Sequence, residues 1–150
     1  MRHLLASSLL AASVLLTVSV LVAAPSSQGQ APQSTALASE MDAIKSELKG
    51  LAMTLRAAPL DAAKALAHVH ELEAHLLAAK RLDPPKLSEL PEAERAAHLT
   101  EYRRDMVAAL DLMLKLELDV LSGDAKSAFE KVSGPLFQHR EASHGKYQKK

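Results

Sequence analysis

The chain has 150 residues, no cysteine, and equal numbers of acidic and basic side chains, so its formal net charge at pH 7 is zero. Without cysteine it cannot form disulfides or hold a cofactor through thioether bonds, and it lacks the basic excess expected of a nucleic-acid-binding protein. Aromatic residues make up only 3% and glycines number 5, and this alanine- and leucine-rich composition favours helix over sheet.

Residues 1–24 have the pattern of an export signal. Arg2 and His3 form a short positive region, and an uncharged run of Leu, Val, Ala, Ser and Thr leads to small residues. This pattern predicts a cleaved secretory signal peptide and a periplasmic protein. An uncleaved membrane anchor is the alternative, because the apolar run is almost long enough to span a bilayer. Residues 25–36 are expected to form a disordered leader, which leaves residues 37–150 as one domain.

Two amphipathic helices are predicted in the first half of this domain. The first runs from about Thr35 to Ala57, and Pro59 ends it. The second follows Asp61, a natural N-cap, and runs to about Arg81. Their apolar stripes comprise Leu37, Met41, Ile44, Leu48, Leu51 and Leu55 in the first helix, and Leu66, Val69, Leu72, Leu76 and Ala79 in the second.

A proline-rich connection over residues 83–91, expected to be a rigid crossing loop, leads to a third predicted helix. This helix starts near Pro91 and ends before Gly123, a residue suited to the turn that follows a helix. From Leu110 to Leu121 it is apolar on more than one face, which indicates deep burial or contact with a second subunit. Its predicted core stripe is Leu99, Tyr102, Met106, Leu110, Met113 or Leu114, Glu117 and Leu121.

The fourth predicted helix follows Asp124 as its N-cap. Proline inside a helix removes a backbone hydrogen bond and clashes with the preceding turn. We therefore expect Gly134-Pro135 to kink this helix near Pro135 or to divide it in two. Four amphipathic helices with short links predict an all-α fold, an up-down-up-down antiparallel four-helix bundle.

In that topology, the start of the first helix and the end of the fourth lie at the same end of the bundle. Met41 and His144 then approach a common core, and a thioether opposite an imidazole is an axial ligand pair for haem iron. Taken alone, Met41 is typical of a core side chain and His144 of a solvated terminus. Arg140, one turn before His144, is suited either to pairing with a haem propionate or to an exposed position on a solvated face. The other side chains expected at this end are Leu72, Leu76, Leu99, Tyr102, Met106 and Phe137.

Two motifs resemble the cytochrome b562 family of soluble periplasmic four-helix bundles, which hold haem b without a covalent bond. They are Asp83-Pro84-Pro85-Lys86-Leu87 after the second helix and the ending Arg140-x-x-x-His144-x-Lys146-Tyr147. The resemblance covers about residues 37–148. It implies that Met41 and His144 are the axial ligands of one haem b and that the protein transfers electrons to and from redox partner proteins, which the sequence does not identify.

The chain departs from this family at three places. Tyr102 and Met106 stand where the family has phenylalanines beside the haem. Gly134-Pro135 adds about one residue to the fourth helix, which affects the register of His144.

Two other functions fit the sequence. His68, Glu71 and His75, with His70 nearby, are spaced so that one helix face presents several metal ligands. Alternatively, the apolar flank of the third helix is suited to a haem-free interaction or chaperone-like protein, with oligomeric state left open. No serine–histidine–aspartate pattern, phosphate-binding loop or cysteine nucleophile is present, so we do not expect an enzyme. Membrane attachment is expected only if the leader is not cleaved.

Overall fold

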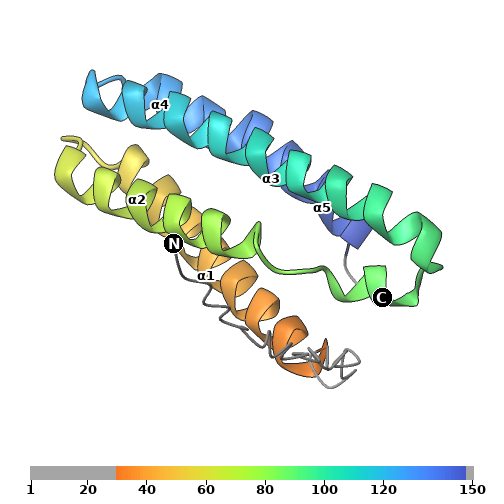
Figure 1. Cartoon of the computed structure of the whole chain (residues 1–150). Coiled ribbons are helices and arrows are strands. Elements are labelled where there is room, and N and C mark those ends of the chain that lie inside the picture. Colours follow the sequence, from red (N-terminus) through yellow and green to blue (C-terminus); the bar gives the residue numbers. More distant parts are fainter. Residues whose placement is uncertain (1–29, 148–150) are drawn as a thin grey trace, which may run out of the picture.

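The computed structural model describes the backbone of residues 30–147 and the side chains of residues 35–143, 146 and 147. The regular structure in this part of the chain is entirely helical, so the predicted all-α class is confirmed. The predicted signal segment, residues 1–24, lies outside the described residues. The elements are α1 Gln30–Arg56, α2 Ala62–Ala79, the 3-10 helix η1 Pro85–Glu89, α3 Glu92–Leu121, α4 Ala125–Lys131, the π-helical turn η2 Val132–Leu136 and α5 Phe137–Tyr147 (Figure 1).

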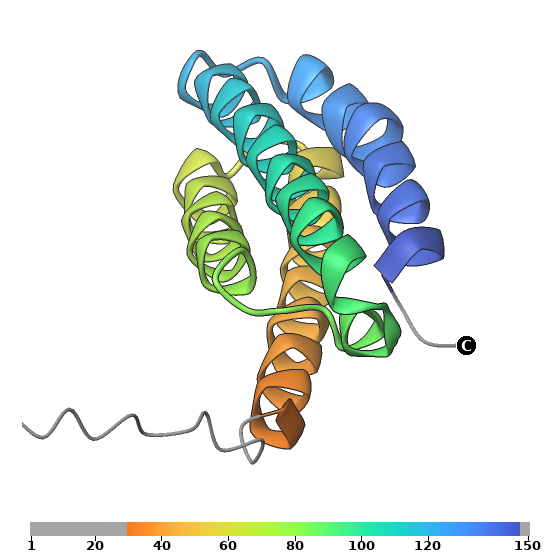
Figure 2. The ribbon, with the colours of Figure 1, turned by 45° about the vertical axis from the view of Figure 1, so that its right-hand side comes forward.

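The helices pack side by side in a bundle-like fold (Figures 1 and 2). Helix α1 lies against α2, α2 against α3, and α3 against α4, while α4 returns to contact α1. Among the described helices, none is long and apolar enough to cross a membrane. The largest fully buried hydrophobic side chains in the core are Leu51, Val69, Leu72, Tyr102, Met113, Leu116 and Val120.

The local signals at two helix starts and one helix end act as predicted. Asp61 Oδ1 accepts a hydrogen bond from the backbone N–H of Lys64 at 3.0 Å, and Asp124 Oδ1 accepts one from Ser127 at 2.9 Å. Both predicted N-caps are therefore confirmed. Gly123, directly after the α3 cap, has a φ of +79°, where a Cβ would be strained.

Two boundaries differ from the sequence prediction. Helix α1 begins at Gln30, inside the segment predicted as a disordered leader, because proline is tolerated in a first helical turn and the flanking alanine and glutamine favour helix. The connection over residues 83–91, predicted as a rigid crossing loop, contains the 3-10 helix η1. Leu87 in η1 is buried and anchors this short helix on the bundle.

The predicted core stripe of α3 is confirmed at Met113, one of the two alternatives given for that turn, and is wrong by one residue at three other positions after Met106. The buried residues there are Ala109, Leu116 and Val120, in place of Leu110, Glu117 and Leu121. Alternating steps of three and four residues keep one helix face toward the core, and these buried residues follow that alternation. Leu114, Leu118 and Leu121, together with Val107, form a second apolar face of α3 that is exposed to solvent.

The fourth predicted helix is divided by η2, which contains Pro135. A π-helical turn closes hydrogen bonds over five residues instead of four and so accommodates one extra residue. This suits a proline, which has no N–H to donate. The turn also sets the register that follows: Leu136 is 6% exposed and faces the core, whereas Phe137 is 51% exposed.

Tyr102 ties α3 to the end of α2. Its side chain is 1% exposed, and its hydroxyl donates a 2.8 Å hydrogen bond to the carbonyl oxygen of Ala79. That carbonyl also accepts the backbone N–H of Leu82 at 3.0 Å. The tyrosine hydroxyl therefore adds one buried hydrogen bond to a backbone group that is already satisfied.

We predict that Tyr102→Phe lowers the free energy of unfolding by about 1 kcal/mol, the net value of one buried hydrogen bond. Helix content should not change, because the ring keeps its packing and the Ala79 carbonyl keeps its other donor. Urea denaturation followed by circular dichroism measures the difference. Equal free energies of unfolding in the two proteins would show that this hydrogen bond contributes nothing to stability.

Candidate functional site

A largely apolar cavity of about 260 Å³ lies among α1, α2, α3 and α5. Helices α1 and α3 provide most of its wall, and the turns η1 and η2 each add one residue. Its lining residues are Leu37, Ala38, Met41, Asp42, Ile44, Leu48, Leu72, Leu76, Pro85, Tyr102, Met106, Ala109, Met113, Leu136, His139, Arg140, Ser143 and Tyr147.

The cavity exists because α5 does not lie against α1. Helix α1 contacts α4 and η2, whereas α5 contacts α3 and η1 and, within the described part of the chain, does not approach α1. Figure 2 shows the lower part of α1, in orange, diverging from α5, in blue. The bundle is therefore closed around α4 and open between α1 and α5.

Six of the eight side chains predicted for a cofactor site line this one cavity. They come from four helices that are far apart in sequence, so the fold brings them together. All are largely apolar side chains, two of them with a polarisable thioether, except for one arginine. They are Met41, Leu72, Leu76, Tyr102, Met106 and Arg140.

The other two predicted residues have different outcomes. Phe137 does not line the cavity, since it is on the surface with the Arg140 guanidinium 5.1 Å from its ring centroid. The extra residue of η2 explains this error, because Leu136 takes the inward position. His144 lies in α5, four residues after Arg140 and three before Tyr147, but its side chain is outside the described residues.

His139 is a cavity residue that the sequence did not single out. Its imidazole lines the cavity, and its Nε2 atom is buried without a hydrogen-bond partner. A buried polar atom without a partner costs about 1–3 kcal/mol, so such an atom calls for an explanation such as a bound ligand. The available signal was its spacing, three residues after Leu136 and four before Ser143, which places it beside the inward stripe.

The cavity lining includes two side chains of the kinds that ligate haem iron. Met41 brings a thioether and His139 an imidazole, and most of the remaining lining is apolar. Thioether and imidazole are established axial ligands of haem iron. Arg140 lies at the cavity edge with its side chain 35% exposed, and its guanidinium pairs with the Glu141 carboxylate at 2.7 Å.

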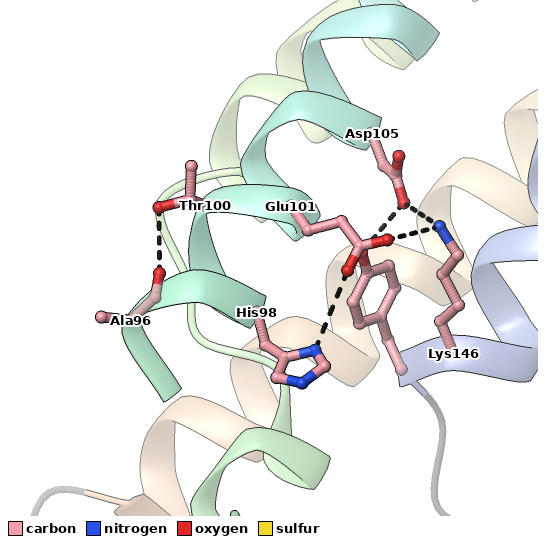
Figure 3. A network of polar contacts seen from close by, with 7 residues as sticks. Ala96, His98, Thr100, Glu101, Asp105 and Lys146 are labelled. Carbon is pink, nitrogen blue, oxygen red and sulfur yellow. Dashed lines mark hydrogen bonds and ion pairs between the residues drawn. The ribbon is translucent and has the colours of Figure 1, made fainter. Parts of the chain in front are cut away.

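Charged side chains hold the end of α5 on α3 (Figure 3). Lys146 Nζ lies 2.9 Å from Glu101 Oε1 and 3.3 Å from Asp105 Oδ2, and these two hydrogen bonds raise the pKa of Lys146. The Tyr147 hydroxyl donates a 2.9 Å hydrogen bond to Asp105, and His98 Nδ1 lies 3.8 Å from Glu101. We name Lys146, Tyr147, Glu101 and Asp105 the α3–α5 clamp.

The histidines of α2 do not gather into one metal site. His68 Nδ1 lies 2.6 Å from a carboxylate oxygen of Glu47. His70 and His75 face Glu117 and Glu40, at 3.1 Å and 2.7 Å. Among the described residues, no group of three or more histidine, aspartate and glutamate side chains could hold a metal ion. The cluster predicted from the spacing of His68, Glu71 and His75 is therefore not formed; each histidine has its own glutamate.

Comparison with known proteins assigns no family, since no protein-family model and no curated protein matches this chain. The interpretation of the cavity accordingly depends on its geometry and its chemistry.

Both tyrosines of the chain line the cavity. Burial raises the pKa of Tyr102, and Asp83 nearby raises it further. Burial and the hydrogen bond to Asp105 raise the pKa of Tyr147. A group whose pKa is higher in the folded state stabilises the fold fully below its unfolded pKa and loses that contribution as pH rises.

We predict that neither tyrosine ionises at about pH 10, the usual value for a phenol, and that tyrosinate absorbance appears at higher pH together with loss of helix. Asp105→Ala should lower the pKa of Tyr147 and produce an earlier tyrosinate step. Asp111→Ala, which removes an exposed carboxylate from the same helix, is the control. Two phenols that ionise at about pH 10 in a fully helical protein would contradict their burial.

Proposed function

We propose that this chain is a periplasmic electron carrier similar to the cytochrome b562 family, with one non-covalent haem b in the cavity and with Met41 and His144 as axial ligands. The observation that carries the proposal is that Met41 and five further side chains predicted for the site line one cavity. These six side chains come from four helices that are far apart in the sequence.

The proposal includes an up-down-up-down antiparallel order of the helices and a kink of the fourth near Pro135. In that order, the start of α1 and the end of α5 lie at the same end of the bundle. Contacts between successive helices and the return of α4 to α1 support this order. The π-helical turn at Pro135 supports a local change of direction.

The side chains of the cavity have distinct roles in this proposal. The soft thioether of Met41, paired with an imidazole, favours the ferrous state relative to two imidazoles. Leu72, Leu76 and Met106 exclude water from the ring, and Arg140 offers charge-assisted hydrogen bonds to a propionate. The bound haem supplies a one-electron iron couple. With Met41 and His144 both bound to the iron, the haem would have no position left for a substrate, which favours a carrier over an enzyme.

The size of the cavity indicates how the cofactor enters. Pockets for small molecules usually measure about 300–1,000 Å³, and this cavity measures about 260 Å³. We therefore expect haem uptake to part α1 from α5. The backbones of these helices do not pack closely in the described part of the chain, so their separation breaks no close backbone packing between them.

We predict that the full chain takes up one equivalent of haem and gives a six-coordinate low-spin absorbance spectrum on reduction. Met41→Leu should lose the spectral signature of a thioether ligand, because leucine keeps the apolar volume and removes the sulfur. Met53→Leu is the matched control, since Met53 is on the same helix and is 65% exposed. Absence of saturable uptake, or equal spectra for Met41→Leu and the unmodified protein, would refute the assigned site.

A second candidate function is a haem-free interaction or chaperone-like role, which one observation favours. Four large apolar side chains on α3 are exposed at successive turns, a pattern that marks interaction surfaces. They are Val107, Leu114, Leu118 and Leu121, each more than half exposed.

If this α3 face is the functional surface, the apo protein should self-associate or bind unfolded chains. Leu114→Lys with Leu118→Lys should abolish that behaviour and leave haem uptake intact, since neither residue lines the cavity. Sedimentation velocity and suppression of aggregation of a model substrate measure the two effects. A monomer without such activity in both proteins would remove this candidate.

A further inference from the structure

Helix α3 carries an exposed apolar face that takes no part in the cavity. Val107, Leu114, Leu118 and Leu121 are each more than half exposed, and we name these four side chains the α3 face. None of them lines the cavity. Large apolar side chains that gather on one exposed surface mark a site for another protein. The arrangement of this face indicates which protein fits it.

The apolar positions here are symmetric about Leu114. Val107 lies seven residues before it and Leu121 lies seven after it. Leu110, partly buried against the core, lies four residues before it, and Leu118 lies four after it. Because successive residues of an α-helix turn by about 100°, all five lie within about 80° of arc. The pattern of apolar positions is therefore the same when α3 is read in either direction.

A face with this symmetry fits a second copy of itself. In a dimer with two-fold symmetry, both copies use the same surface and each contact occurs twice. Two antiparallel α3 helices that meet at Leu114 place this residue beside its own counterpart. They also place Val107 of each copy beside Leu121 of the other. An unrelated partner requires no symmetry of this kind.

The charges beside the α3 face suit the same arrangement. Asp111 lies three residues before Leu114 and Lys115 lies one after it, on the same side of the face. Within one chain they form an exposed ion pair at 2.7 Å. The two-fold axis exchanges positions before and after Leu114, so the Asp111 of each copy comes within reach of the Lys115 of the other. This charge complementarity favours the antiparallel register.

The size of the α3 face indicates how tightly the copies bind. It runs over fourteen residue steps, which is about 21 Å at 1.5 Å per residue. A standard stable interface buries about 800 Å² on each partner, and a single helix face with four half-exposed side chains supplies less. We therefore expect a dimer that dissociates reversibly on dilution.

We infer that two copies of this chain form a reversible antiparallel dimer through the α3 face, with Leu114 on the two-fold axis. The inference goes beyond the proposed electron transfer, because the α3 face is separate from the cavity. Haem uptake and dimer formation are measured separately, so either can fail without the other. The dimer also covers the face, which is then closed to unfolded chains.

Single cysteines test the register directly, because the chain has none of its own. A disulfide needs Cα atoms within about 7 Å of each other, so a crosslink identifies facing positions. Under mild oxidation of the full chain, Leu114→Cys should crosslink to itself. Val107→Cys and Leu121→Cys should crosslink weakly alone and strongly when mixed. Met53→Cys, at a 65% exposed position of α1, is the control and should stay monomeric on a non-reducing gel.

Sedimentation velocity over a range of concentrations measures the dimer itself. The unmodified full chain should show a monomer–dimer equilibrium. Leu114→Lys should raise the dissociation constant by more than about tenfold, because two like charges meet at the axis. Its circular dichroism should not change, since Leu114 is 52% exposed. Met53→Lys makes the same change at an exposed position outside the α3 face and should leave the equilibrium as it is.

Three results would overturn the inference. A chain that is monomeric at every concentration forms no dimer, whatever its haem uptake. Association that persists unchanged in Leu114→Lys uses another surface. Val107→Cys and Leu121→Cys proteins that crosslink to themselves as readily as to each other are not antiparallel. Binding of an unfolded model substrate, lost in Leu114→Lys and accompanied by no crosslink at Leu114→Cys, would assign the face to unfolded chains instead.

Discussion

The wide separation of the α1 and α5 backbones, in the part of the chain that the structure describes, is the constraint on which the rest of the site depends. Four-helix packing normally fills the space between first and last helices, and here a cavity of about 260 Å³ takes its place. Its lining is largely apolar, so a ligand that removes this surface from water stabilises the folded protein, which is why we interpret the cavity as a binding site.

Two features keep α5 away from α1. At its far end, the α3–α5 clamp holds Lys146 and Tyr147 on Asp105 and Glu101 of α3. At its start, η2 accommodates Pro135 and changes the register, so that Leu136 faces the cavity and Phe137 does not. The same two features fix the segment that carries both histidines of α5, so the geometry of any iron ligand there depends on them.

Much of this arrangement was predictable from sequence, and the errors have physical reasons. Helix caps at Asp61 and Asp124 depend on local chemistry and were identified correctly. The core stripe predicted for α3 is partly wrong because that helix is apolar on two faces, and periodicity alone does not show which face is buried. The inward position predicted for Phe137 is wrong because a 3.6-residue period takes no account of the extra residue in a π-helical turn. His139 was overlooked because an unpaired buried nitrogen is a property of three-dimensional packing and has no sequence pattern.

The central claim, that the cavity beside Met41 binds haem, is tested most directly by NMR of the protein with ¹³C-labelled methionine methyl groups. The chain has 5 methionines, of which Met41, Met106 and Met113 line the cavity while Met53 is exposed. On addition of reduced haem, the ring current should shift the Met41 methyl most, with smaller shifts for Met106 and Met113 and none for Met53. Unchanged cavity methyl signals, or a largest shift at Met53, would contradict the account.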